Sequence, residues 1–386
     1  MPPEAFTLRI SDAAINDLRG RLFRTRLPDQ APGDPWEYGT SVDYLNGLIE
    51  HWRNGFDWRA QEARLNAFPQ YKVPLHDIDV HFLHVPGKGP NPTPLLLMHG
   101  WPGSVFEFID MIPRLTDPAS FGGDPADAFT VVAPSLPGYG LSFRPGQKRF
   151  GIEEIADCLA DLMTETLGYK RFAAQGGDWG GITAARLGYA HAAKLIGIHV
   201  NFLGGVRRDP AAITNPTTPE EERFRDQLAY WAKEETGYIS IQGTKPQTLS
   251  FGLTDSPAGL AAWIIEKFRT WSDCNGDVES VFSRDELLAN ISFYWFTEAI
   301  GSSFYPYYFR VHRPWPIPEG GTVGVPTGYS EFPREILLPP RSLAARTYTD
   351  IRRWTVMPRG GHFAAMEQPE LFSKDVLAFG KLLRSA

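Results

Sequence analysis

The chain has 386 residues, 42% of them hydrophobic and 22% charged, as is usual for a soluble globular protein of one large or two medium domains. A net charge of -7 gives no electrostatic reason to expect nucleic acid as a partner, and two cysteines, Cys158 and Cys274, form neither a disulfide framework nor a zinc site. Since no signal-peptide pattern and no membrane-length apolar stretch is present, we expect a cytoplasmic protein without a membrane anchor.

Residues 1–75 are predicted to form an N-terminal arm. Ser11-Asp12 can cap a helix whose apolar positions include Ile15, Leu18 and Leu22. A second helix is expected over 42–52, and a short third helix follows Asp57. So few helices, joined by proline-rich connections, bury little apolar surface by themselves. We therefore expect this arm to wrap the main domain in a structural role.

From residue 76 to residue 205, strand patterns alternate with helix patterns. Strands are predicted at 78–85, 94–98, 129–134 and 195–200, and another leads into a glycine-rich stretch at Gly176. Helices are expected over 106–112 and 152–167. This alternation predicts an α/β fold with a mainly parallel sheet, of which 76–205 is the first part of the core.

Two histidines in the strand 78–85 raise the question of a metal site. His81 and His84 would lie on opposite faces of the strand, and no carboxylate or thiol nearby completes a set of ligands. We expect no metal there.

The alternation ends after Asn201. Residues 206–318 are mostly helical in pattern and rich in aromatic residues, with helices expected near 220–235, 259–269, 284–290 and 291–300. We interpret this segment as a lid over the carboxyl edge of the sheet. Strands at 322–325 and 354–357 and a helix over 369–383 would complete the core, so 319–386 is its second part.

A glycine-packed turn connects an apolar strand to a helix around Asp178. The sequence Gly176-Gly177-Asp178-Trp179-Gly180 matches the nucleophile-elbow pattern, in which the flanking glycines allow a very tight turn. The usual nucleophile is serine, whereas a carboxylate needs no base and can attack an sp3 carbon to form an ester. The glycine pattern fits neither a dinucleotide fingerprint nor a P-loop, and a purely structural turn is the alternative.

An elbow nucleophile requires an acid and a histidine later in the chain, in that order. His362 follows the strand predicted at 354–357 and is preceded by two glycines, whereas His312 lies in a proline-rich segment and ranks far lower. Glu331 and Glu335 are both candidates for the acid. The local pattern leaves the choice between these two open.

Several motifs in the same order resemble the microsomal-type epoxide hydrolases of the α/β-hydrolase superfamily. The resemblance covers nearly the whole chain and implies the α/β-hydrolase fold with a helical lid and an N-terminal arm. We expect the chain to lack the membrane-anchoring helix of the mammalian members and to be similar to the soluble bacterial ones. The motifs are Leu18-Arg19-Gly20-Arg21-Leu22, Trp58-Arg59 through Gln70, His99-Gly100-Trp101-Pro102-Gly103-Ser104, Gly176 to Gly180, Gly237-Tyr238 to Lys245-Pro246, and Arg359 to Ala365.

The resemblance implies a role for individual residues. Asp178 would be the nucleophile, and Glu335, rather than Glu331, would orient His362. Tyr238 would be one tyrosine that assists ring opening. The second would be Tyr307, with Tyr305 as the alternate, because Pro306 interrupts the usual local pattern.

These roles predict a two-step reaction. Asp178 attacks the epoxide while phenol hydroxyls stabilise the ring oxygen, and His362 then activates the water that hydrolyses the ester. The backbone amides of Trp101 and Trp179 would form the oxyanion hole. The expected partners are a small-molecule epoxide and water, with no metal or cofactor, and a homodimer stays open.

Two other functions compete with this interpretation. A haloalkane dehalogenase also uses an elbow aspartate, but it needs halide-binding N–H donors where this chain offers tyrosines. A catalytically silent binding protein would not need Asp178, Glu335 and His362 together. The aromatic lid favours a roomy apolar pocket, which suits a detoxification role on aryl or alkyl epoxides and a biosynthetic role on one bulky epoxide equally well.

Overall fold

The computed structural model describes residues 2–204, 206 and 215–384. Residue 205, at the end of the predicted first core segment, and residues 207–214, at the start of the predicted lid, lie outside the described residues. The strands are β1 Glu4–Phe6, β2 Gln70–Leu75, β3 Ile78–Val85, β4 Thr93–Met98, β5 Phe129–Pro134, β6 Phe172–Gly176, β7 Leu195–Val200, β8 Thr327–Glu331 and β9 Ile351–Val356.

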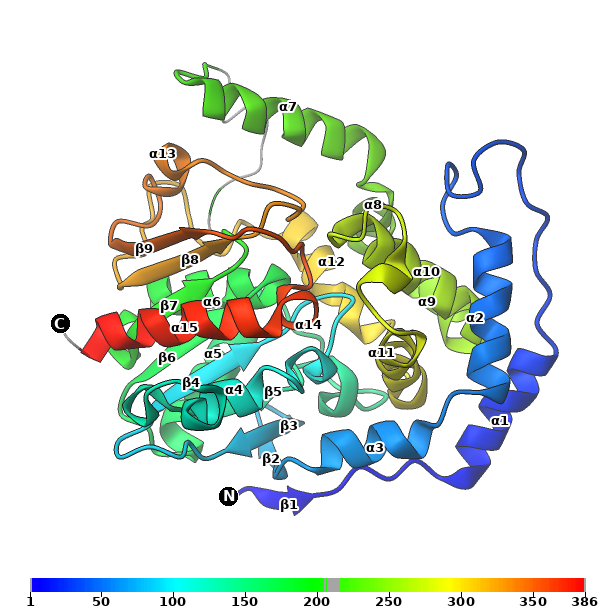
Figure 1. The fold of residues 1–386 in the computed structure, drawn as a ribbon, viewed down its shortest axis with the longest axis horizontal. Coiled ribbons are helices and arrows are strands. Elements are labelled where there is room, and N and C mark those ends of the chain that lie inside the picture. Colours follow the sequence, from blue (N-terminus) through cyan, green and yellow to red (C-terminus); the bar gives the residue numbers. More distant parts are fainter. Residues whose placement is uncertain (1, 205, 207–214, 385–386) are drawn as a thin grey trace.

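The described helices surround this set of strands (Figure 1). They are α1 Asp12–Phe23, α2 Val42–Asn54, α3 Trp58–Asn66, α4 Ile112–Thr116, α5 Ile152–Asp161, α6 Asp178–Ala190, α7 Pro219–Glu234, α8 Gly237–Thr244, α9 Pro246–Asp255, α10 Pro257–Trp271, α11 Arg284–Thr297, α12 Tyr305–His312, α13 Arg341–Ala344, α14 Ala364–Glu367 and α15 Pro369–Arg384.

All of these strands belong to one sheet, in the order β1-β2-β3-β5-β4-β6-β7-β8-β9. The pairs from β5 to β9 are parallel, whereas β1, β2, β3 and β5 pair antiparallel. Helices α5 and α6 cover one face of the sheet, and α4 and α15 cover the other. The chain therefore has the predicted α/β-hydrolase architecture, in which the strand β4 is completely buried from Leu95 to Met98.

The predicted helices of the N-terminal arm are confirmed. The hydroxyl of Ser11 accepts the N–H of Ala14 at the start of α1, and Asp57 caps α3 in the same way. Strands β1 and β2, which were not predicted, add this arm to the antiparallel end of the sheet.

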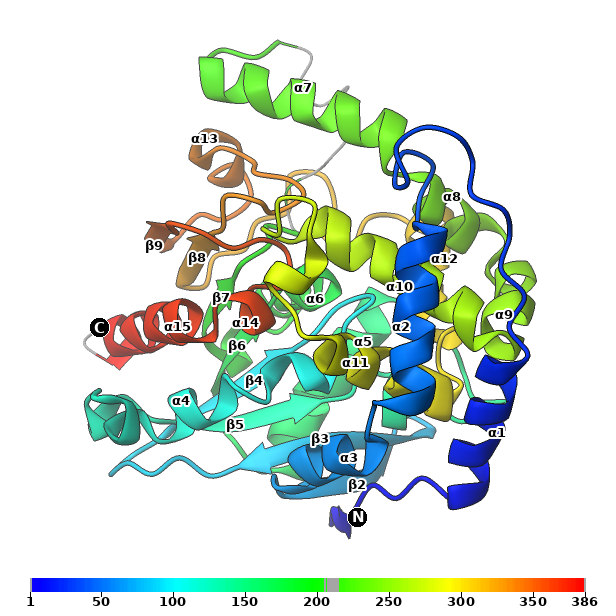
Figure 2. The same cartoon turned by 45° about the vertical axis from the view of Figure 1, so that its right-hand side comes forward.

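The arm also contacts the helices that follow the core strands. Trp52 of α2 donates its indole N–H to Ser292 of α11 at 2.9 Å, and His51 pairs with Asp285 at 2.7 Å. Figure 2 shows α2 crossing in front of α10 and α11. The arm thus ties the sheet to the helical segment.

Four predicted elements differ from the structure. The helix expected over 106–112 is a 3-10 turn, Val105–Phe108, followed by α4. The two helices expected at 284–290 and 291–300 form the single helix α11. The strand expected at 322–325 is reduced to an isolated bridge between Val323 and Tyr348, and the sheet strand is β8 instead.

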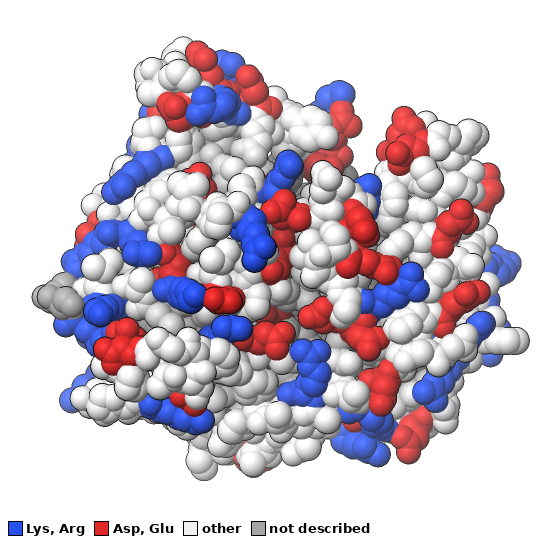
Figure 3. Space-filling view, in the orientation of Figure 1, with Lys and Arg blue, Asp and Glu red and all other residues white. Residues whose placement is uncertain are grey.

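The surface carries no single-sign field on the face shown in Figure 3, where basic and acidic side chains are interspersed. Among the helices that the structure describes, none combines the length and the apolar character that crossing a bilayer requires.

Candidate active site

The turn between β6 and α6 places Asp178 at the carboxyl edge of the sheet. Asp178 has a φ of +46°, a left-handed conformation that is uncommon for any residue other than glycine. A Cβ on Gly176 would lie 2.2 Å from the carbonyl carbon of Gly180, and one on Gly100 would lie 2.3 Å from the Cβ of Asp178. The turn is therefore a nucleophile elbow in geometry as well as in sequence.

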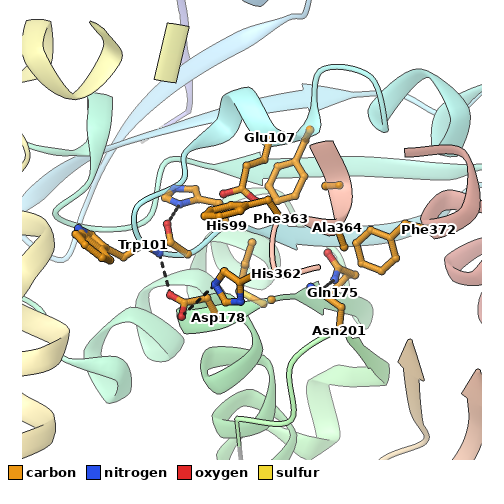
Figure 4. A pocket seen from close by; sticks show the side chains of 15 residues that line it. His99, Trp101, Glu107, Gln175, Asp178, Asn201, His362, Phe363, Ala364 and Phe372 are labelled. Carbon is orange, nitrogen blue, oxygen red and sulfur yellow. Dashed lines mark hydrogen bonds and ion pairs between the residues drawn. The ribbon is translucent and has the colours of Figure 1, made fainter. Parts of the chain in front are cut away.

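A line of polar contacts runs from Asp178 to Glu335. One carboxylate oxygen of Asp178 accepts the backbone N–H of Trp101 at 2.9 Å, and the other lies 3.7 Å from Nε2 of His362. The ring of His362 points at this carboxylate in Figure 4. On its other side, Nδ1 of His362 lies 2.6 Å from Oε1 of Glu335. The structure thus brings together the three residues that the sequence assigned to nucleophile, base and acid.

The two candidate acids, Glu331 and Glu335, have different partners in the structure. Glu331 accepts the indole N–H of Trp354 at 2.9 Å and does not contact His362. The chain then turns so that Glu335, which is buried, faces His362, and the N–H of Ile336 donates to the same carboxylate oxygen at 2.7 Å. His312, at the end of α12, stacks on Tyr308 and takes no part in this arrangement.

Opposing effects set the proton affinity of His362. Burial alone would lower the pKa of this imidazole, but Glu335, followed by Asp178 and Glu107, raises the pKa to about 9. These charges therefore favour the imidazolium at neutral pH, and the loss of nearby negative charge would favour the neutral base.

Aromatic rings form the wall opposite Asp178. Trp101 stacks on Tyr238 with ring centroids 5.2 Å apart, and Tyr307 meets Trp179 edge-on at 4.6 Å. The Tyr307 hydroxyl is buried beside the Trp179 indole. Burial raises the pKa of this hydroxyl well above the usual value, although the interaction with Trp179 opposes the shift. The ring centroids of Tyr238 and Tyr307 are 5.7 Å apart, so both predicted tyrosines lie in this wall.

The alternate tyrosine lies elsewhere. Tyr305 contacts Tyr308, Phe309 and the guanidinium of Arg149, all away from Trp101 and Trp179. Both tyrosines belong to α12, which begins at Tyr305 with Pro306 in its first turn. Because residues two positions apart on a helix point in different directions, only Tyr307 faces the elbow.

The two amides proposed for the oxyanion hole flank Asp178. The N–H of Trp101 already donates to the carboxylate. The loop before it is fixed by His99, whose Nδ1 lies 3.0 Å from the carbonyl of Gly100 and whose Nε2 accepts the N–H of Leu136 at 3.1 Å. Trp179 lies in the first turn of α6, where backbone N–H groups have no acceptor within the helix.

A cavity of about 20 Å³ lies beside Asp178 and His362 (Figure 4). This volume is enough for one water molecule. Gln175 lines it and has a buried amide oxygen without a partner among the described residues, and Glu107 faces it as well. Burial raises the pKa of Glu107 to about 8, although the charge of His362 opposes this shift.

No sequence motif points to Glu107 or Gln175. Glu107 lies in the 3-10 turn that was predicted as regular helix, and Gln175 is one polar residue in an apolar strand. The polar side chain of Gln175 within this apolar strand is the one sequence signal that could have indicated the cavity.

The sequence matches two family models. The model described as "Epoxide hydrolase N terminus" matches residues 3–108, and the model described as "alpha/beta hydrolase fold" matches residues 93–200.

Similar proteins extend this match to the whole chain. A Stigmatella aurantiaca protein named "Putative epoxide hydrolase" is 43% identical over 98% of this chain and 85% of its own length. "Epoxide hydrolase 1" of Oryctolagus cuniculus is 37% identical over 97% of this chain and 88% of its own length.

Solved structures agree with these relatives. The juvenile hormone epoxide hydrolase of Bombyx mori superposes with a TM-score of 0.88 at 29% identity, covering 99% of this chain and 95% of that one. The Aspergillus niger epoxide hydrolase gives a TM-score of 0.86 at 28% identity, covering 99% and 97%. The chain therefore belongs to the epoxide hydrolase family and is an enzyme of that family.

Proposed function

We propose that this enzyme converts an apolar epoxide to a vicinal diol through a covalent ester on Asp178. The observation that carries the proposal is that Asp178 contacts His362, which pairs with Glu335, and accepts the N–H of Trp101. The ring of Trp101 in turn contacts Tyr238 and Tyr307. His362 supplies a base, and the two tyrosines supply hydroxyl donors for a ring oxygen.

In the first step, the carboxylate of Asp178 attacks a ring carbon and the C–O bond of the epoxide breaks. The ring oxygen gains negative charge, which the hydroxyls of Tyr238 and Tyr307 stabilise before one of them transfers its proton. General acid catalysis of this kind contributes typically 10²- to 10⁴-fold to a rate.

In the second step, His362 removes a proton from a water molecule that attacks the carbonyl carbon of the ester. The acyl C–O bond then breaks, which releases the diol and the Asp178 carboxylate, and the proton taken up by His362 returns to the tyrosinate left by the first step. The cavity of about 20 Å³ beside Asp178 and His362 suits this water. Esterification removes the negative charge of Asp178, one cause of the high pKa of His362, and so favours the neutral base. The N–H groups of Trp101 and Trp179 would stabilise the oxyanion, and each such donor is worth about 3 kcal/mol.

The proposal also assigns the parts of the chain. Residues 1–75 are a structural arm, 76–205 and 319–386 form the core, and 206–318 act as a lid whose aromatic side chains line the substrate side.

Buried rings such as Trp101 and Trp271 favour an aryl or alkyl epoxide of xenobiotic or biosynthetic origin. We propose a cytoplasmic enzyme. Tyr238 and Tyr307 disfavour the rival function of a haloalkane dehalogenase. Their hydroxyls can donate hydrogen bonds to the oxygen of an epoxide ring, whereas a dehalogenase binds halide through N–H groups.

His362→Gln tests the proposal, since it removes the base but keeps the nucleophile and the tyrosines. With styrene oxide as the probe, we expect the peptide containing Asp178 to gain the mass of the epoxide, while the diol forms at least 10³-fold more slowly. His312→Gln is the matched control, because this histidine is exposed and distant, and it should turn over like the wild type. An unmodified Asp178 peptide in His362→Gln would contradict the ester mechanism.

A further inference from the structure

A second carboxylate, Glu367, holds the loop that carries His362. Its Oε2 atom accepts the backbone N–H of Gly361 at 2.9 Å and that of Asp273 at 2.8 Å, and its Oε1 atom accepts the N–H of Phe363 at 2.9 Å. The side chain is buried at the end of α14. Glu367 thus binds the residues on both sides of His362, together with one residue from a distant part of the chain.

That distant part is the segment Trp271–Asp273, which ends α10 and follows it. The carbonyl of Trp271 accepts the N–H of His362 at 2.9 Å, and the carboxylate of Asp273 accepts the N–H of Gly360 at 2.9 Å. A Cβ on Gly361 would lie 2.6 Å from the same Trp271 carbonyl, so the two backbones approach too closely for any other residue.

Side chains support the same junction. Phe268 of α10 stacks on Phe363 with centroids 4.0 Å apart, and the ring of Trp271 meets that of His362 edge-on at 5.1 Å. The position of the imidazole therefore depends on α10 as well as on the sheet. Glu367 joins the two because it is the shared acceptor for N–H groups from both sides.

We propose that Glu367 is a positioning residue that locks the His362 loop onto the segment Trp271–Asp273, and that hydrolysis of the ester depends on this lock whereas formation of the ester does not. The inference rests on the proposed function. Ester formation uses Asp178 and the two tyrosines, whereas the hydrogen bonds of Glu367 go to the backbone of Gly361, Phe363 and Asp273. Ester hydrolysis requires Nε2 of His362 to aim at a water beside Asp178, and a misplacement of about 1 Å can cost on the order of 100-fold.

Glu367→Gln is the most direct test, because it keeps the size of the side chain. A carboxylate offers only acceptors, whereas the amide nitrogen of glutamine is a donor. In either orientation the new N–H₂ group faces at least one backbone N–H, so at least one bond of the lock is lost. We expect ester hydrolysis to slow by about 10- to 100-fold and ester formation to stay within about twofold of the wild type.

Both rate constants come from one experiment. Enzyme in excess is mixed with styrene oxide, the reaction is quenched at intervals, and the ester on the Asp178 peptide is followed by mass spectrometry together with the free diol. Glu370→Gln is the matched control, since Glu370 lies three residues further on, is exposed and pairs with Lys374 on the surface. It should leave both rate constants unchanged.

Asp273→Ala provides a second test from the other side of the junction. It removes the acceptor of the Gly360 N–H without touching Asp178, and we expect the same selective loss of ester hydrolysis. Equal slowing of both steps in Glu367→Gln, or no slowing of either, would overturn the positioning role. If the wild type itself forms no ester, the proposed function fails instead, so the two failures are distinguishable.

Discussion

Asp178 combines a strained backbone with an electrostatically favourable position. A left-handed conformation costs a residue with a Cβ about 1–2 kcal/mol, and here the turn enforces it through the glycines on either side. The carboxylate lies at the N-terminus of α6, where the helix dipole stabilises negative charge. In the proposed mechanism, this strained turn exposes the carboxylate of Asp178 as the nucleophile.

Replacing Tyr307 tests the role of the aromatic wall. We expect Tyr307→Phe to slow ester formation by about 100-fold, because one of two donors to the ring oxygen is lost. Its hydroxyl is buried beside the Trp179 indole, so its removal should change the free energy of unfolding by no more than about 1 kcal/mol. Tyr305→Phe is the control and should change neither quantity. Single-turnover kinetics measure the rate of ester formation, and urea unfolding measures the free energy of unfolding. If Tyr305→Phe and not Tyr307→Phe slowed ester formation, Tyr305 would be the second tyrosine that assists ring opening.

The pH dependence of ester hydrolysis tests the His362–Glu335 pair. Hydrolysis requires neutral His362, so its rate constant should rise with pH through the pKa of this residue. In Glu335→Gln the burial of His362 remains but the strongest attraction is lost, so its pKa falls. We expect the midpoint to move to lower pH by about one unit or more, with a lower plateau rate. Glu331→Gln should leave the midpoint unchanged, and an unchanged midpoint in Glu335→Gln would contradict the pairing.

At the scale of elements, β7, β8 and β9 are joined to α15 by one buried carboxylate. Asp375 of α15 accepts hydrogen bonds from Ser330 and Thr355 at 2.7 Å, from Arg353 at 2.7 Å and from His199 at 3.1 Å. Burial would raise the pKa of Asp375, but these donors outweigh it and hold the pKa well below its usual range. This network stabilises the half of the core that supplies Glu335 and His362.

Removing this charge should lower stability in a pH-dependent way. We expect Asp375→Asn to lower the free energy of unfolding by about 2–4 kcal/mol at neutral pH. The stabilisation is fully present above the unfolded pKa of about 3.9 and is lost as pH falls through the lower folded pKa, so the variant should lose less stability on acidification. Asp350→Asn, which alters a surface pair with Arg352, should have little effect. Urea unfolding at several pH values measures these free energies. Equal stability of Asp375→Asn and the wild type at neutral pH would contradict the stabilising role of Asp375.

Elements with strong local signals were predictable, and those defined by tertiary contacts were not. Ser11 and Asp57 mark helix starts because capping is a local interaction. Strand β8 carries no local pattern, since Gly328 and Ser330 interrupt it and both of its faces are buried. Helix α11 continues through Asn290 because that side chain bonds the carbonyl of Pro102, a contact between distant segments.

The whole molecule brings the site together from segments that are distant in sequence. The loop at Trp101, the elbow at Asp178, the helices with Tyr238 and Tyr307, and the loop at His362 meet at one edge of the sheet. The motifs identified these residues, because the resemblance to a family carries tertiary information. The junction at Glu367 and the cavity at Glu107 were missed, because no local pattern relates their parts.

A single turnover in water enriched in oxygen-18, with enzyme in excess over styrene oxide, tests the covalent mechanism most directly. Because Asp178 supplies the oxygen that bonds to the ring carbon, we expect the first diol to be unlabelled and the peptide containing Asp178 to gain the label. Label in the first diol with none in the peptide would mean that water attacks the epoxide directly, and the assignment of Asp178 as nucleophile would be wrong.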